Sequence, residues 1–139
     1  MSEANKALIR RLVDGYWNKR DPKVFDEVFA ARFLDHTPMP GTQGTKEGLR
    51  QLTLGVQSAF PEGHNTLDDV LADGDRVAWR WTYRGVQKGP LMGIPATGKT
   101  ITITGITIDR IAGGQIVERW SQIDSLGMMT QLGVIPPPR

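Results

Sequence analysis

Residues 105–133 read GITIDRIAGGQIVERWSQIDSLGMMTQLG, and this stretch decides the expected fold. It holds two β-branched runs joined by Gly113 and Gly114, a pair that supplies the positive φ angles of a tight hairpin. Alternate residues of the second run share one face of a strand. The residues of that face are Ile116, Glu118, Trp120, Gln122 and Asp124. An acid on the same face as a large aromatic side chain is typical of a pocket with one proton-transfer group, so we expect the chemical centre here.

The chain before this hairpin also alternates in the manner of strands. Strands are predicted over residues 64–72, 76–86, 100–111 and 115–124. The third of these alternates Thr and Ile over most of its length, which favours a long strand. The sequence DGD at residues 73–75 predicts the turn between the first two.

The first half of the chain carries helical periodicity instead. Apolar side chains at helical spacing predict an amphipathic helix over residues 4–18. Asp21 before Pro22 is a helix-start signal, since Asp caps the first turn and Pro is tolerated there. Thr45 is the matching signal for a helix over residues 46–60.

Two shorter segments complete the expected architecture. Two prolines and a glycine predict a loop over residues 33–41, and residues 125–132 predict a last short helix. Helices followed by strands indicate an α+β domain spanning residues 1–139, with N-terminal helices packed on one face of a curved antiparallel sheet. Such a cone has one open mouth, which is a common place for a small-molecule site.

The composition excludes several classes of protein. The 139 residues contain no cysteine, so neither a disulfide framework nor thiolate chemistry is available. A formal charge of +2 gives no argument for nucleic acid, and no apolar run approaches the roughly 18 residues of a membrane span. The first residues lack the apolar region of a signal peptide. We therefore expect a cytoplasmic protein with neither a membrane nor a nucleic-acid partner.

One stretch matches the sequence pattern of a nucleotide-binding loop but lacks the structural context of that motif. Residues 93–100, GIPATGKT, fit G-x-x-x-x-G-K-[ST]. A phosphate-binding loop opens a helix, whereas this stretch leads into a predicted strand. We interpret it as a Gly/Pro-rich connection between strands. A metal site is not expected either, because the two histidines, His36 and His64, lie far apart in the chain.

Two candidate catalytic residues each have a second interpretation. Asp124 is either a pocket acid or the N-cap of the helix that starts at Ser125. His36, next to Asp35, is either a catalytic group or a loop residue that bonds neighbouring backbone. Trp81 belongs to an apolar strand face, which lines a pocket or simply forms core.

The chain resembles the SnoaL-like polyketide cyclases, a family of the NTF2-like superfamily. Residues 114–120 (GQIVERW), then Asp124, then residues 131–133 (QLG) are similar to the closing pattern of that family. Residues 92–99, MGIPATGK, resemble its M-G-I-P-P-T-G-K loop, with Ala96 in place of the second proline. The resemblance covers most of the chain.

This resemblance implies an NTF2-like cone, a homodimer, and ring closure of a hydrophobic, carbonyl-rich molecule by aldol chemistry without cofactor or metal. It assigns the general acid/base to Asp124, for which burial near Trp120 would raise the pKa into the working range. We add His36 as a second catalytic candidate. The expected substrate-binding residues are Trp120, Gln122, Gln87, Trp81, Tyr16 and Met92. Gln87 departs from the family, because it stands where many members carry a histidine, and an amide cannot exchange a proton near neutrality.

Two other functions remain open. One is a small-molecule-binding protein with the same pocket and no turnover. The other is an epoxide hydrolase of the limonene type, which needs an Asp-Arg-Asp arrangement around a water. Asp109 and Arg110 are adjacent and therefore point to opposite faces, so the sequence does not predict that arrangement.

Overall fold

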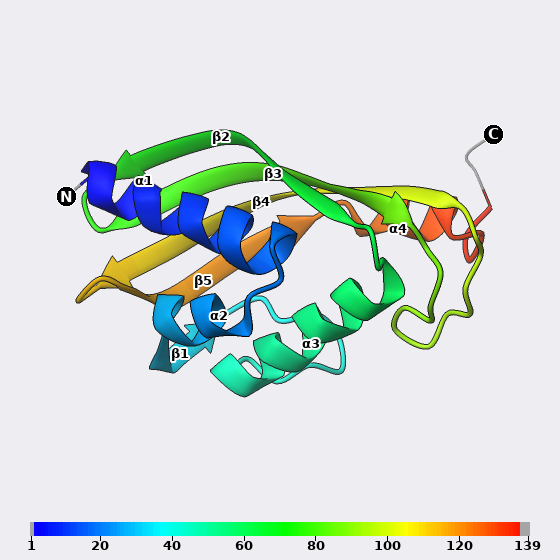
Figure 1. Ribbon diagram of the computed structural model, residues 1–139, viewed down its shortest axis with the longest axis horizontal. Helices are drawn as coiled ribbons and strands as arrows, with labels where there is room; N and C mark the ends of the chain where they lie inside the picture. Colours follow the sequence, from blue (N-terminus) through cyan, green and yellow to red (C-terminus); the bar gives the residue numbers. More distant parts are fainter. Residues whose placement is uncertain (1, 137–139) are drawn as a thin grey trace.

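The computed structural model describes residues 2–136. Its helical elements are α1 (Ser2–Arg11), the π-helical segment η1 (Leu12–Asn18), α2 (Pro22–Val28), α3 (Lys46–Ala59) and α4 (Ser125–Gln131). Its strands are β1 (Phe29–Asp35), β2 (His64–Asp73), β3 (Arg76–Val86), β4 (Thr100–Ala112) and β5 (Gln115–Ile123). Figure 1 shows the helices packed against the long strands, so the predicted α+β class is confirmed.

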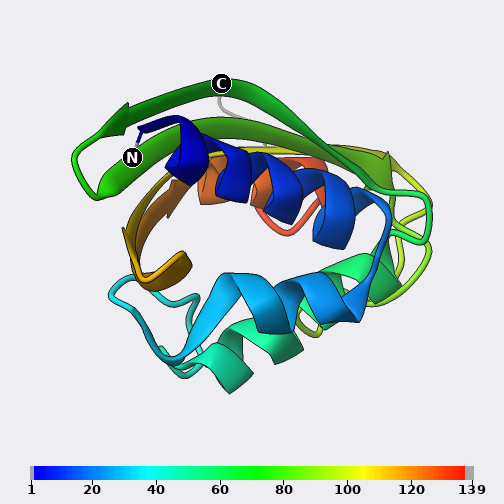
Figure 2. The same cartoon turned by 60° about the vertical axis from the view of Figure 1, so that its left-hand side comes forward.

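The five strands form one sheet in the order β1-β5-β4-β3-β2. The four predicted strands pair antiparallel as neighbours, whereas β1 pairs with β5 in parallel. The sheet is therefore mixed, and the prediction of a loop was wrong for Phe33, Leu34 and Asp35, which lie in β1. The short β1 carries no clean alternation, and its strand form depends on pairing with β5, far away in the sequence. Figure 2 shows the sheet curving around the helices of the N-terminal half.

The hairpin between β4 and β5 has the predicted two-residue turn. Ala112 pairs with Gln115, and the intervening Gly113 and Gly114 have φ angles of 60° and 74°. A non-glycine residue adopts such angles at a steric cost, so the glycine pair fixes the turn and with it the register of the two strands.

The predicted helix starts are also confirmed. The Asp21 side chain accepts a hydrogen bond from the Lys23 N–H, and Thr45 accepts one from the Gly48 N–H. The first helix differs from its prediction, because it continues as the π-helical segment η1 after Arg11. Residues 93–99 lead into β4 with no helix after them, as expected for a connection between strands.

Two apolar clusters of the core flank the site described below. The first gathers α1, η1 and α2 against β3 around Phe25, and the second gathers the end of α3, β4 and α4 around Phe60. Trp17 and Trp81 are only partly buried, and each packs against both clusters. No helix within residues 2–136 is long and apolar enough to cross a membrane.

Candidate functional site

A cavity of about 120 Å³ opens between η1, α3 and the concave face of β3, β4 and β5. Its wall is mainly apolar and aromatic, with Trp17, Trp79 and Trp81 among its residues. The polar side chains on this wall are Asp35, Thr37, Thr53, Asn65, Thr107, Arg119 and Ser121. A mostly apolar cavity with a few convergent polar groups is the usual form of a small-molecule site.

Sheet register places the two charged residues of the wall, Asp35 and Arg119, in one row with the buried Asp109. Arg119 on β5 is the direct partner of Asp35 on β1 and of Asp109 on β4. Directly paired residues project to the same face of a sheet. An Asp-Arg-Asp row is therefore assembled from three strands, two of them neighbours in one hairpin and the third, with Asp35, far away in the sequence.

Asp109 and Arg119 form a buried ion pair beneath the cavity. The Arg119 Nε and Nη2 groups donate to the two carboxylate oxygens of Asp109 at 2.7 and 2.9 Å. The Trp79 indole N–H donates to the same carboxylate at 3.0 Å. Burial disfavours the charged guanidinium, but the attraction and hydrogen bonds of Asp109, with the charge of Asp35, keep the pKa of Arg119 above its ordinary value. Arg119 thus stays cationic, and its Nη1 has no partner within residues 2–136.

Asp35 is the carboxylate that the cavity wall leaves available. Its Oδ1 accepts hydrogen bonds from the backbone N–H and the hydroxyl of Thr37, at 2.9 and 3.3 Å. Its Oδ2 has no hydrogen-bond partner among the described residues. The turn after β1 therefore fixes the carboxyl group while leaving one oxygen for a ligand.

A chain of hydroxyl groups lies beside this carboxylate. The Trp81 indole N–H donates to Thr107 Oγ1 at 3.0 Å, and Thr107 Oγ1 lies 2.7 Å from Ser121 Oγ. Either hydroxyl can be the donor of this bond, and both residues line the cavity. When Thr107 donates to Ser121, the proton of the Ser121 hydroxyl is available as a donor at the cavity wall.

Trp81 holds this position because it lies over a glycine. A Cβ atom on Gly105 would overlap the indole ring of Trp81, which comes from the neighbouring strand. The missing side chain lets the indole lie against β4 and reach Thr107. Trp81 was predicted to bind substrate, and the structure places it on the wall, as it does Met92, which has a positive φ of 48°.

Three other predicted residues do not line the cavity. The side chains of β5 that enter it are Arg119, Ser121 and Ile123, so Trp120 and Gln122 point away from it, and Asp124 follows the strand as the N-cap of α4. The expected placement of those three residues on a pocket wall was wrong, because alternation defines two faces without saying which is inside. Asp124 is exposed, and it caps α4 by accepting a hydrogen bond from the Gly127 N–H at 2.9 Å.

His36 also lies outside the cavity. Its ring stacks on Trp120 with the ring centroids 4.7 Å apart, and its Nε2 lies 2.7 Å from a Glu118 carboxylate oxygen. The hydrogen bonds from His36 and then Arg110 hold the pKa of Glu118 below its ordinary value. His36 is therefore part of a polar and aromatic cluster on the outer face, directly behind the row of Asp35 and Arg119.

Gln87 is fully buried but serves the loop rather than the cavity. Its amide nitrogen donates to the carbonyls of Gly89, Ile94 and Pro95, and its oxygen accepts from the N–H and hydroxyl of Thr97. These bonds engage both ends of the amide, so the expected contact with substrate was misplaced. Gln87 instead fixes the path of the loop that carries Met92.

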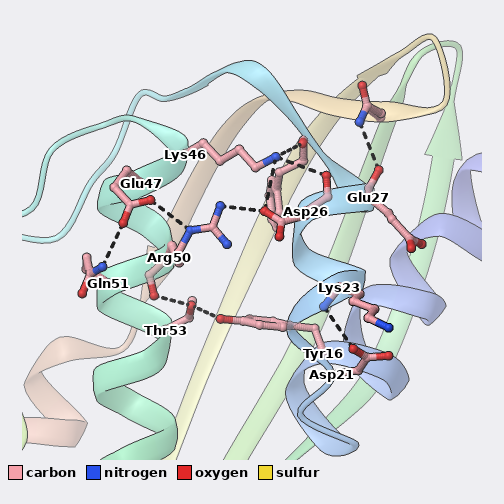
Figure 3. Close-up of polar contacts among 12 residues, drawn as sticks. Tyr16, Asp21, Lys23, Asp26, Glu27, Lys46, Glu47, Arg50, Gln51 and Thr53 are labelled. Atoms are coloured by element: carbon pink, nitrogen blue, oxygen red, sulfur yellow. Dashed lines mark hydrogen bonds and ion pairs between the residues drawn. The ribbon is translucent and has the colours of Figure 1, made fainter.

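Tyr16 lies behind the residues that line the cavity. Its hydroxyl is 2.5 Å from that of Thr53, which lines the cavity (Figure 3). The same figure shows how α3 is held against α2, where Arg50 of α3 bonds Asp26 of α2 at 2.7 Å. Within α3, Glu47 bonds the same guanidinium at 2.9 Å. The hydrogen bond from Arg50 lowers the pKa of the Asp26 carboxyl. Tyr16 therefore positions the helical wall and does not contact the cavity directly.

The sequence pattern missed Asp35, Asp109, Arg119 and Ser121 as a group. One signal was present, since Asp109 shares its parity with the buried Ile101, Ile103 and Ile111 of β4. A charged residue on a buried face requires a partner of opposite charge. Among residues 2–136 no group of three or more His, Asp and Glu side chains is arranged to hold a metal ion.

Known proteins agree with this architecture. The family model of the SnoaL-like polyketide cyclases matches residues 7–132. No curated protein matches the chain. IdmH, a putative polyketide cyclase from Streptomyces antibioticus, is 31% identical with a TM-score of 0.80, over 93% of this chain and 98% of IdmH.

Two further solved structures resemble the chain. TsrD from Streptomyces laurentii is 29% identical with a TM-score of 0.85, over 96% of this chain and 97% of TsrD. AclR, a putative hydroxylase from Streptomyces galilaeus, is 24% identical with a TM-score of 0.87, over 99% of this chain and 85% of AclR. The likeness to AclR establishes the shared fold alone.

Proposed function

Because the chain belongs to the SnoaL-like polyketide cyclase family, we propose that it closes a ring in a hydrophobic, carbonyl-rich small molecule by aldol chemistry. The observation that carries this proposal is the Asp35 carboxylate, which keeps one oxygen without a partner from residues 2–136 in a mainly apolar cavity. A single positioned carboxylate suffices to move a proton from a carbon that flanking carbonyls have already acidified. The proposed chemistry uses side chains alone.

In the proposed reaction, Asp35 removes the proton from a carbon between two carbonyl groups. The carbon–hydrogen bond breaks and its electron pair forms an enolate. The enolate carbon attacks a second carbonyl of the same molecule, forming the new carbon–carbon bond. The resulting alkoxide takes up a proton, which Asp35 can return, so the ring-closed aldol has the mass of the substrate.

Arg119 and Ser121 are suited to stabilise the negative oxygen that develops. Both side chains lie on the cavity wall, two residues apart on β5. The guanidinium is held charged and in place by Asp109, and the Ser121 hydroxyl is held by its hydrogen bond with Thr107. Donors fixed before the reaction stabilise an oxyanion more than mobile water does.

Asp124 and His36 remain the rival assignment, which rests on the resemblance to the family. The exposed side chain of Asp124 and its bond to α4 favour Asp35 instead. Matched variants separate the two: Asp35→Asn should lower turnover by about two to four orders of magnitude. Asp124→Asn preserves the cap and should leave turnover and stability near those of the wild type.

The assay follows aromatic poly-β-ketones by chromatography and mass spectrometry. Ring closure leaves the mass unchanged, or lowers it by one water if the aldol dehydrates. Loss of turnover in Asp124→Asn with full turnover in Asp35→Asn would reverse the assignment. Tight binding of these compounds with no new product would instead support a binding protein without turnover.

A second candidate function is favoured by the row of Asp35, Arg119 and Asp109. Two carboxylates around a guanidinium are the arrangement that an epoxide hydrolase of the limonene type requires. Here one carboxylate would deprotonate a water that attacks the epoxide carbon, while the other carboxyl group, in its protonated form, gives its proton to the opening oxygen. Asp109 makes this the second choice, since both of its oxygens are already bonded. A product heavier than its epoxide by one water would identify this activity.

We also propose that the protein forms a homodimer through the outer face of the sheet. Ile106 and Ile108 on that face are 54% and 39% exposed, beside Trp120. Arginine and acidic side chains surround them, including Arg80 bonded to Asp69. An apolar centre with a charged rim suits the contact of two identical surfaces. Light scattering should show a dimer that Ile108→Glu converts to a monomer.

A further inference from the structure

Asn65 carries a polar atom that the described protein leaves without a partner. The residue is on β2, 3% exposed, and its side chain lines the cavity. Its Oδ1 is buried and accepts no hydrogen bond within residues 2–136. Buried polar atoms are nearly always paired, so an unpaired acceptor on a cavity wall points to a partner inside the cavity.

The position of Asn65 is fixed by the end of the π-helical segment. The Asn18 amide donates to the Asn65 carbonyl and accepts from the Asn65 N–H, both at 2.8 Å. These two bonds occupy the backbone groups that β2, an edge strand, would otherwise leave open. The side chain thus stands on a rigid base, beside its direct cross-strand partner Tyr83.

Tyr83 does not supply the missing partner. Its hydroxyl lies against Gly63, where a Cβ atom would overlap it, and it too has no hydrogen-bond partner among the described residues. Tyr83 lines the cavity together with Trp17, and their ring centroids lie 5.4 Å apart. Among the cavity-lining residues of β2 and β3, Asn65 is the one that is not aromatic.

Register separates Asn65 from the proposed reaction centre. Thr107 is opposite Trp79, and Tyr83 lies four residues further along β3. That distance is about 13 Å along an extended strand. The intervening wall is formed by Trp81, which packs against both core clusters.

We propose that Asn65 is a specificity-determining residue that accepts a hydrogen bond from a hydroxyl group at the far end of the substrate. This deepens the proposed function and rests on it: the substrate is an elongated, mainly apolar molecule, with its reacting carbonyl near Ser121 and a hydroxyl near Asn65. A molecule that lacks this hydroxyl leaves the buried amide unpaired and is bound less tightly.

Three compounds of one shape test this assignment. They are 4-acetylbiphenyl, 4-acetyl-4′-hydroxybiphenyl and 4-acetyl-4′-methoxybiphenyl. At the end opposite the carbonyl, the first has no polar group, the second has a hydroxyl that can donate a hydrogen bond, and the third has a methoxy oxygen that can only accept one. Equilibrium dialysis with the full chain gives their dissociation constants. We expect the hydroxyl compound to bind about tenfold more tightly than the other two.

Two variants assign the preference to Asn65. Asn65→Leu keeps the size but not the acceptor, so the three compounds should bind equally. Asn65→Asp keeps an acceptor and should retain the preference for the hydroxyl compound, even if Asn65→Leu folds poorly. Equal or undetectable binding of the three compounds to the wild type, or an unchanged preference in Asn65→Leu, would overturn the proposal.

The test of Asn65 can fail or succeed independently of the test of the proposed reaction. If Asp35→Asn still turns over its substrate, the reaction assignment fails while the hydroxyl preference stands. If the preference is absent but Asp35→Asn is inactive, only the role of Asn65 is refuted.

Discussion

The carboxylate of Asp109 receives two hydrogen bonds from the guanidinium of Arg119 on the neighbouring strand, and both side chains are buried. The pair holds the positive charge of the buried Arg119 side chain at the cavity wall. The effect of this ion pair on stability differs from its effect on the charge of the site. A buried ion pair adds little net stability, but removal of one partner leaves a charge with no compensation.

Asp109→Leu should therefore lower the free energy of unfolding by about 3–5 kcal/mol, because Arg119 remains buried and charged. Urea denaturation followed by circular dichroism measures this loss. The double variant Asp109→Leu/Arg119→Met removes both charges and should recover most of it. A single variant as stable as the wild type would contradict the account.

Gln87→Leu should loosen the loop between β3 and β4. The amide holds three carbonyls and Thr97, so its loss leaves several partly buried polar groups unpaired, at a cost of about 1–3 kcal/mol for each one that water does not reach. Limited proteolysis should show faster cleavage within residues 88–98. Gln122→Leu, on the exposed outer face, is the control and should leave the cleavage rate unchanged.

Glu118 predicts a specific dependence of stability on pH. His36 and Arg110 lower its pKa in the folded protein, so folding favours the charged form. The resulting stabilisation is present above the ordinary pKa of a glutamate and is lost as the pH falls through the lower folded value. Wild type and Glu118→Gln should thus differ in urea midpoint at pH 7 and converge in acid. A difference that grows as the pH falls would refute the assignment.

Gly105→Val should displace Trp81 from β4. The new side chain overlaps the indole, so the bond to Thr107 breaks and the ring moves into the cavity, at a cost of about 1–3 kcal/mol. Thermal unfolding and tryptophan fluorescence report both effects. Gly55→Ala on α3 is the matched control, because nothing lies within 4 Å of its added Cβ. It should raise stability by about 0.5–1 kcal/mol, and a similar gain in Gly105→Val would exclude the overlap.

The fold was largely predictable because its signals are local. The Gly113–Gly114 turn and the Asp21 and Thr45 caps each depend on a few adjacent residues. The site was less predictable because its key contacts cross strands. In β4 both faces read as apolar, yet Ile106 and Ile108 are exposed while Thr107 and Asp109 are buried. Which face is inside depends on the helices that cover it, and the Asp35–Arg119 pairing depends on β1, whose strand form the local pattern did not indicate.

The amide of Gln87 fixes the path of the loop between β3 and β4 largely through backbone groups of that loop. Three of its bonds end on backbone carbonyls, which every amino acid possesses. A substitution at a loop residue whose side chain makes none of these bonds, such as Met92, should therefore leave the path of the loop intact while it changes what the loop presents. Met92 lies on the cavity wall and is 43% exposed. Natural or laboratory evolution can exchange such a residue to admit new molecules without rebuilding the fold.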